Sequence, residues 1–216
     1  MKSYKKIAAL LSAVTLLCGA AYAAPAAEKG SAVQEAAKTV SSVKLPYTYE
    51  SAAYGYRIMC PKQPVGVIPA SALFENREGE VLIFENEEYH IKYAWVVLVN
   101  AFSDSAVPDL NKINPEEAVK LLGGIMGSNG YEGIMLVNLS DSNKAIFATT
   151  AKEVEIDEDG DGVVDATASA DSQMALLFFR GENGKRYGLE LIDNPELRSD
   201  SLSAFIEGAR TLHAMQ

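Results

Sequence analysis

The run YAWVVLVNAF, at residues 93–102, constrains the fold most, because its apolar side chains alternate onto both faces of a strand. The two sets are Ala94, Val96 and Leu98 on one face, and Trp95, Val97 and Val99 on the other. A strand that is apolar on both faces must be covered on both. The run MALLFF (174–179) makes the same demand. Both segments therefore predict a central sheet that is buried between two layers.

Two segments are able to supply covering helices. NPEEAVKLLGGIM (114–126) begins with an Asn cap, has Pro at the first helical position and places two Glu at the positive end of the helix dipole. NPELRSDSLSAFIEGARTLHAM (194–215) repeats that start. Its apolar residues share one helical stripe: Leu202, Phe205, Ile206, Ala209 and Leu212.

The remaining apolar periodicity indicates strands joined by short turns. Strands are expected at 56–60, in the two halves of 81–102, and near 132–138, 145–156, 163–179 and 186–192. The last two are joined by the hairpin-type turn GENGK. We therefore predict an α+β fold, in which an antiparallel sheet of about six to seven strands has a helix packed on each face, as an α/β/α sandwich.

Several sequence features of this chain, and their order along it, are shared with a known family. They are the opening strand YGYRIMCP closed by Pro61, the late strand RYGLELI and the closing helix LSAFIEGARTL. Together they resemble the PsbP-like α/β/α sandwich family over roughly residues 50–214. The resemblance implies a non-catalytic accessory or binding protein of an exported compartment, and it carries over no functional residue. The chain departs from the family in lacking a Trp after Pro61 and in adding an acidic hairpin.

The N-terminal residues predict export. A basic start, an apolar core and the small residues of AYA give residues 1–23 the layout of a secretory signal peptide. Residues 24–45 are small and polar and are expected to form a flexible or partly helical tether to a single domain at 46–216. No later apolar run approaches the length of a membrane span, so we expect a mature chain without one, in the periplasm or the medium. Cys60 would be the only cysteine left after cleavage, and it is expected to be a buried apolar residue.

The charge balance restricts the partners. The chain has 29 acidic against 19 basic residues and a formal net charge of −10. This balance argues against nucleic acid and anionic lipid, which would be repelled. The expected partner is an exported protein or a cell-surface component, whose identity the sequence leaves open.

The stretch EVEIDEDGDGVVDATASAD (153–171) is the candidate metal site. Its spacing follows the calcium-loop pattern D-x-[DN]-x-[DN]-G, and the proposed ligands are Asp157, Asp159, Asp161, the carbonyl of Val163 and Asp165. Ala168 stands where an EF-hand needs a Glu, and the flanks alternate as strands, so the motif is predicted to lie on a β-hairpin. It resembles the calcium loops of dockerins and thrombospondin type 3 repeats. A calcium site and a solvated acidic turn both remain open.

The sequence holds no recognisable catalytic constellation. The two histidines lie apart, with His90 in an alternating strand and His213 in the expected last turn of the C-terminal helix. No His-x-x-x-His, Cys-x-x-Cys or G-x-S-x-G pattern occurs in the mature chain. We therefore predict a non-catalytic, exported accessory or binding domain. The alternatives are a calcium-stabilised extracellular binding module and a carboxylate-dependent hydrolase.

Overall fold

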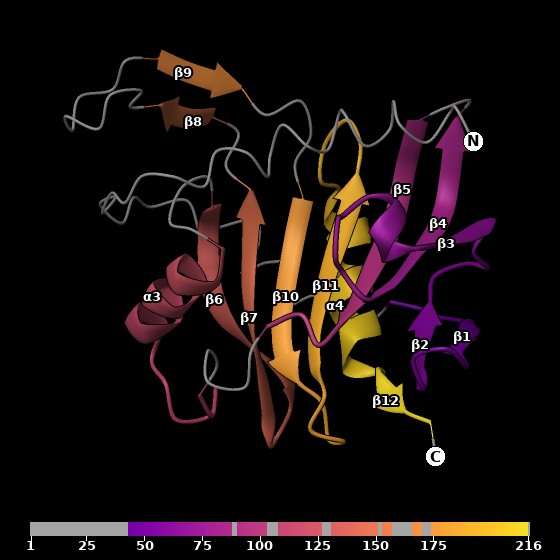
Figure 1. Cartoon of the computed structure of the whole chain (residues 1–216), viewed down its shortest axis with the longest axis horizontal. Helices are drawn as coiled ribbons and strands as arrows, with labels where there is room; N and C mark the ends of the chain where they lie inside the picture. The colour runs from indigo at the N-terminus through magenta and orange to yellow at the C-terminus, as the bar shows by residue number, and fades with distance from the viewer. Residues whose placement is uncertain are drawn as a thin grey trace.

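The computed structural model describes residues 43–87, 90–102, 108–126, 131–150, 153–156, 166–169 and 174–215 (Figure 1). The predicted signal peptide and the predicted tether up to residue 42 lie outside the described residues. Leu45, the last residue of that tether, is buried and belongs to the hydrophobic core. The end of the tether segment is therefore packed against the fold.

Seven antiparallel strands form the main sheet. In spatial order they are β3 (Gly66–Pro69), β4 (Gly79–Glu87), β5 (His90–Val99), β11 (Arg186–Asp193), β10 (Met174–Arg180), β7 (Asn143–Thr150) and β6 (Tyr131–Ser140). Every neighbouring pair is antiparallel. The α+β class and the strand number are as predicted.

Two of the predicted long strands are each divided. The segment 145–156 is split between β7 and β8 (Glu153–Ile156), and 163–179 is split between β9 (Ala166–Ser169) and β10. β8 and β9 pair with each other in a separate two-stranded sheet. The residues on both sides of the acidic loop are thus strands, as the alternating pattern predicted.

A second sheet of three strands was not predicted from the sequence. It consists of β1 (Tyr47–Ser51), β2 (Tyr56–Cys60) and β12 (His213–Ala214), with β2 in the centre. The expectation that His213 lies in a helix is wrong, because the helix ends at Arg210 and His213 pairs with Arg57 across the small sheet. Thr211 marks that end: its hydroxyl donates to the Gly208 carbonyl at 2.7 Å and accepts from the Met59 amide at 2.9 Å.

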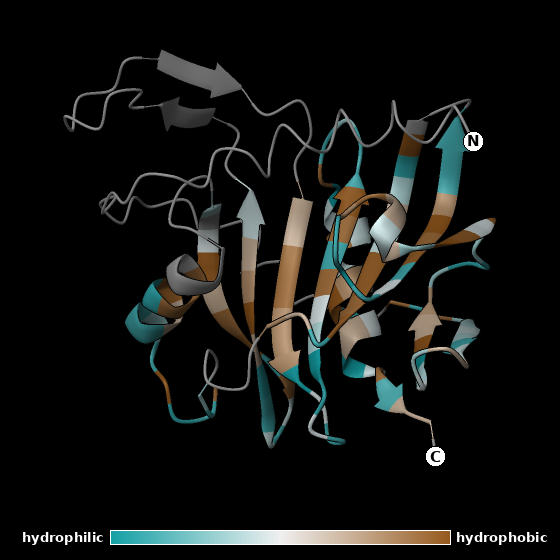
Figure 2. Cartoon of the chain, viewed as in Figure 1, coloured by the Kyte–Doolittle hydropathy of each residue, from teal (hydrophilic) through white to brown (hydrophobic). Residues whose placement is uncertain are grey.

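The main sheet is buried on both faces, as the two-sided strands required. Trp95, Val97 and Val99 of β5 belong to one hydrophobic cluster, and Ala94, Val96 and Leu98 belong to the other. All six are at most 5% exposed. Figure 2 shows the hydrophobic residues along the middle of the strands and hydrophilic ones toward strand ends.

The two helices differ in how well the sequence located them. α3 (Pro115–Met126) begins where predicted, and the Asn114 side chain caps it by accepting from the Glu117 amide. α4 (Ser199–Arg210) begins later than the predicted Asn-Pro-Glu start. Asn194 donates instead from its side chain to the Ile91 carbonyl at 3.0 Å, and Asp193 accepts from the Arg198 backbone amide at 3.0 Å. These two contacts hold residues 194–198 as a connection between β11 and α4.

The helices contact different parts of the sheet. α4 packs against β2, β6 and β11 and contributes to the cluster that holds Trp95. α3 contacts the edge strand β6, and its Ala118 and Leu122 join the second cluster with Ala70 of the short 3-10 helix η2 (Ala70–Ala72). One helix covering each face remains a prediction. In the described part of the chain, neither helix is long and apolar enough to cross a membrane.

Candidate functional site

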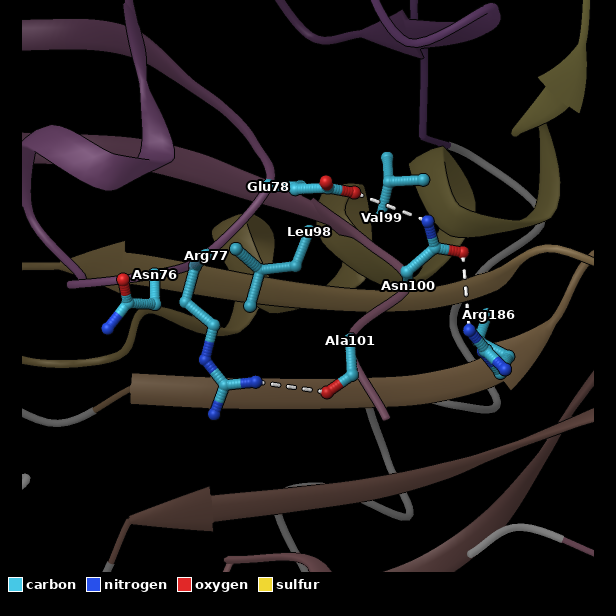
Figure 3. A pocket seen from close by; sticks show the side chains of 8 residues that line it. All are labelled: Asn76, Arg77, Glu78, Leu98, Val99, Asn100, Ala101 and Arg186. Carbon is cyan, nitrogen blue, oxygen red and sulfur yellow. Dashed lines mark hydrogen bonds between the residues drawn. The ribbon is translucent and has the colours of Figure 1, made fainter. Parts of the chain in front are cut away.

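A shallow pocket of about 300 Å³ lies where the loop before β4 meets the end of β5 and the start of β11 (Figure 3). Its lining consists of Asn76, Arg77, Glu78, Leu98, Val99, Asn100, Ala101 and Arg186. The lining contains two arginines and one carboxylate, so this surface is net positive, although the chain as a whole is acidic. We call it the Arg77 pocket.

The backbone around the Arg77 pocket is unusual. Within the described ranges, Asn76 and Asn100 are the residues other than glycine with positive φ, at 59° and 56°, and both line the pocket. Asn tolerates this left-handed conformation better than most residues, but it is still sparsely populated and recurs at binding sites. Gly79 follows with φ of 139°, and a Cβ there would lie 2.0 Å from the Val97 carbonyl oxygen. Only glycine therefore fits where the loop enters β4.

A set of hydrogen bonds fixes the pocket walls (Figure 3). The Arg77 Nη1 group donates to the Ala101 carbonyl at 3.1 Å. The Asn100 side-chain amide donates to Glu78 Oε2 at 3.3 Å, and its oxygen accepts from Arg186 Nη2 at 3.5 Å. Three segments far apart in the sequence are thus joined through side chains at one rim. A guanidinium held in this way presents its remaining N–H groups as donors for an oxyanion.

A buried carboxyl lies close to this pocket, on the same face of the sheet. Glu190 of β11 is 6% exposed, and its Oε2 atom has no hydrogen-bond partner among the described residues. Burial raises the pKa of Glu190 to about 7, while the charge of Arg77 acts in the opposite direction. Glu190 is therefore a carboxyl that changes its charge near neutral pH.

A second polar cluster lies at the other end of β11. Asp193 is almost fully buried and accepts from the Arg198 guanidinium at 2.9 Å and 3.1 Å. Arg198 and Lys62 each lie over the Tyr93 ring, at 5.6 Å and 5.5 Å from its centre, and Lys62 also pairs with Glu85. The charges of Asp193, Arg198, Lys62 and Glu85 are thus paired with one another, so this cluster is not an open site.

The other residues that the sequence singled out are placed as follows. The proposed calcium ligands Asp157, Asp159, Asp161, Val163 and Asp165 lie outside the described residues. Among the residues that the structure describes, no three His, Cys, Asp or Glu side chains gather in a way that could hold a metal ion.

Cys60 is buried and unpaired, as predicted, and burial raises the pKa of its thiol to about 12. A thiol with such a pKa is almost entirely protonated and unreactive at neutral pH.

The residues of the Arg77 pocket were missed at the level of sequence. Asn76 lies in the polar run ENRE (75–78) and Asn100 follows the apolar stretch 94–99, so both look like ordinary turn residues. Glu190, which lies outside the pocket lining, alternates with Leu189 and Leu191 in a largely apolar strand. A charged residue inside a strand buried on both faces was the available signal. What brings the pocket together is the pairing of β4 with β5 and of β5 with β11, which periodicity alone does not reveal.

Comparisons with known proteins find similarity to solved structures. No protein-family model matches the chain, and no curated protein matches it. The chain is similar to the solution structure of cyanobacterial PsbP (CyanoP) from Synechocystis sp. PCC 6803, with 11% sequence identity and a TM-score of 0.43. The match covers 78% of this chain and 91% of that chain. The predicted resemblance to PsbP is thus found again in a solved structure, and at these values it extends to no residue and no function.

Proposed function

We propose that the chain is an exported, non-catalytic accessory domain of the α/β/α sandwich type, which binds an anionic group of a partner protein or cell-surface component in the Arg77 pocket. The observation that carries this proposal is the convergence of Arg77 and Arg186 with the two left-handed asparagines at one rim. Arg77 is an exposed residue, and its guanidinium is oriented by its hydrogen bond to the Ala101 carbonyl. An oriented guanidinium loses less conformational freedom when it binds an oxyanion.

A titration with a simple oxyanion tests this proposal. Sodium sulfate is added to the isotopically labelled full chain, with sodium chloride of equal ionic strength as reference, and amide chemical shifts are followed by NMR. We expect saturable shifts around residues 76–78 and 98–101 with sulfate and not with chloride. Arg77→Gln should abolish them.

The matched control is Arg57→Gln. Arg57 is an exposed residue of β2 and is not part of the lining of the Arg77 pocket, so this variant should bind sulfate like the wild type. Equal loss of binding in both variants would mean that sulfate responds to overall charge. Absence of saturable shifts in the wild type would refute the proposal.

We also propose calcium binding by the acidic hairpin as a second function. The supporting observation is that β8 and β9, the two strands that flank the acidic stretch, are antiparallel and that Ile156 pairs with Ala166. Alternate residues of a tight loop can point several carboxylates at one centre, and hard cations prefer oxygen ligands. An incomplete ligand set predicts a weak site with a dissociation constant of about 0.1–1 mM.

Thermal unfolding of the full chain in millimolar calcium, in magnesium and in chelator tests the calcium site. A rise in Tm specific to calcium and lost in Asp159→Ala/Asp161→Ala would support a structural ion. Identical curves in all conditions would leave the hairpin as a solvated turn.

A further inference from the structure

We propose that anion binding in the Arg77 pocket and protonation of Glu190 favour one another, so that the proposed binding activity becomes stronger as the pH falls. This inference rests on the proposed function above, and it assigns a regulatory role to a buried side chain outside the pocket lining.

The position of Glu190 follows from strand register. Glu190 pairs with Leu176 of β10 and with Val96 of β5, and Val96 pairs in turn with Val81 of β4. Leu176, Val96 and Val81 all belong to the second hydrophobic cluster, so Glu190 is the polar member of an apolar row across the sheet. Gly188, two residues earlier on β11, pairs with Leu98 of the pocket lining. The carboxyl thus lies one row away from the pocket.

The charged surroundings of Glu190 are few. On its own strand, Ile192 is apolar and Gly188 has no side chain. β5 and β10 pair with Glu190 through Val96 and Leu176 of the apolar cluster. η2 and α3 contribute Ala70, Ala118 and Leu122 to that cluster, while the charged residues of α3, Glu116, Glu117 and Lys120, are exposed. Among the described residues, Arg77 is the charged group that acts on Glu190.

The coupling follows from this shared charge. The positive charge of Arg77 favours the carboxylate form of Glu190, and burial opposes that form. An anion bound to Arg77 offsets this charge, so the carboxylate loses its favourable interaction and takes up a proton more readily. The coupling is reciprocal. When Glu190 is protonated, its carboxyl no longer offsets the positive charge of Arg77, so Arg77 binds the anion more tightly.

The test compares sulfate affinity at about pH 6 and about pH 8, on either side of the Glu190 titration. Sulfate is the probe because it remains a dianion over this range, so any change in affinity comes from the protein. The NMR titration is run on the full chain as wild type, Glu190→Gln and Arg57→Gln. Gln is neutral and close in shape to protonated Glu, so it holds position 190 in the uncharged state at both pH values.

We expect the wild type and Arg57→Gln to bind sulfate about fivefold more tightly at the lower pH, which is the lower end of typical coupling between two sites. Glu190→Gln should bind equally at both pH values, with the affinity of the wild type at low pH. Binding by the wild type without a pH dependence, or a pH dependence that persists in Glu190→Gln, would overturn the coupling and leave the proposed function intact. No saturable binding at either pH would overturn both.

Discussion

Glu190 makes the stability of the sheet depend on pH at the scale of a single residue. Its pKa is raised from 4.5 to about 7, mainly by burial, so the unfolded chain releases this proton at a lower pH than the folded chain does. The contribution to stability is full below about pH 4.5 and is lost as the pH rises through about 7.

We therefore expect Glu190→Gln to raise the free energy of unfolding above pH 7 by about 3 kcal/mol, with little change near pH 4. Urea denaturation across this pH range measures the difference. A constant offset between the two proteins at all pH values would show that Glu190 does not titrate in the folded chain.

Gly208 determines how closely α4 packs on the sheet. A Cβ at this position would lie 2.5 Å from two ring carbons of Trp95 and 3.2 Å from the Met59 carbonyl oxygen. Trp95 is fully buried and also contacts Phe84 and Phe205 edge-on, so its ring has little room to move.

Gly208→Ala should lower the free energy of unfolding by about 1–3 kcal/mol, the usual cost of overpacking a core. Helix propensity alone would favour Ala by up to about 1 kcal/mol, so the sign of the change separates the two effects. A variant more stable than the wild type in chemical denaturation would contradict the close contact.

At the scale of elements, the start of α3 is fixed by a capping box. The Asn114 side chain accepts from the Glu117 amide at 2.9 Å, and the Glu117 carboxylate accepts from the Asn114 amide at 2.8 Å. Two amides that lack helical partners are thereby satisfied reciprocally.

Asn114→Ala should destabilise the protein by about 1 kcal/mol, because it removes the cap from the first turn. The control Glu116→Gln changes an exposed acidic residue of the same turn and should cost less than about 0.5 kcal/mol. Equal Tm values for the wild type and Asn114→Ala would contradict a stabilising role for the cap.

At the scale of the whole molecule, a buried tyrosine links the small sheet to the large one. Tyr56 of β2 is fully buried, and its hydroxyl donates to Glu80 of β4 at 2.9 Å. Burial, followed by the charge of Glu80, raises the pKa of Tyr56 well above its ordinary value, so the hydroxyl stays protonated and remains a donor.

Tyr56→Phe should cost about 1–2 kcal/mol and increase amide hydrogen exchange in β1 and β2, because Glu80 loses its buried donor. Tyr47→Phe is the matched control, since Tyr47 lies in the same small sheet but is 45% exposed. Unchanged exchange in Tyr56→Phe would mean that apolar packing alone holds the small sheet in place.

The sequence by itself determined the features that depend on local periodicity. The two-sided alternation of residues 94–99 predicted a sheet covered on both faces, and the Asn-Pro-Glu start at 114–116 predicted where α3 begins. The same start at 194–196 failed, because Asp193 and Asn194 are engaged by Arg198 and Ile91 in the folded chain.

The tertiary structure decided everything that depends on long-range pairing. β12 has only two residues and is defined by its pairing with β2, so no local pattern could reveal it. The Arg77 pocket likewise exists because β5 pairs with β4 on one side and with β11 on the other, which brings residues 76–78, 98–101 and 186 to one rim. The periodicity of the sequence predicts which face of the sheet a side chain points to. Only the register between strands determines which side chains of neighbouring strands lie next to each other.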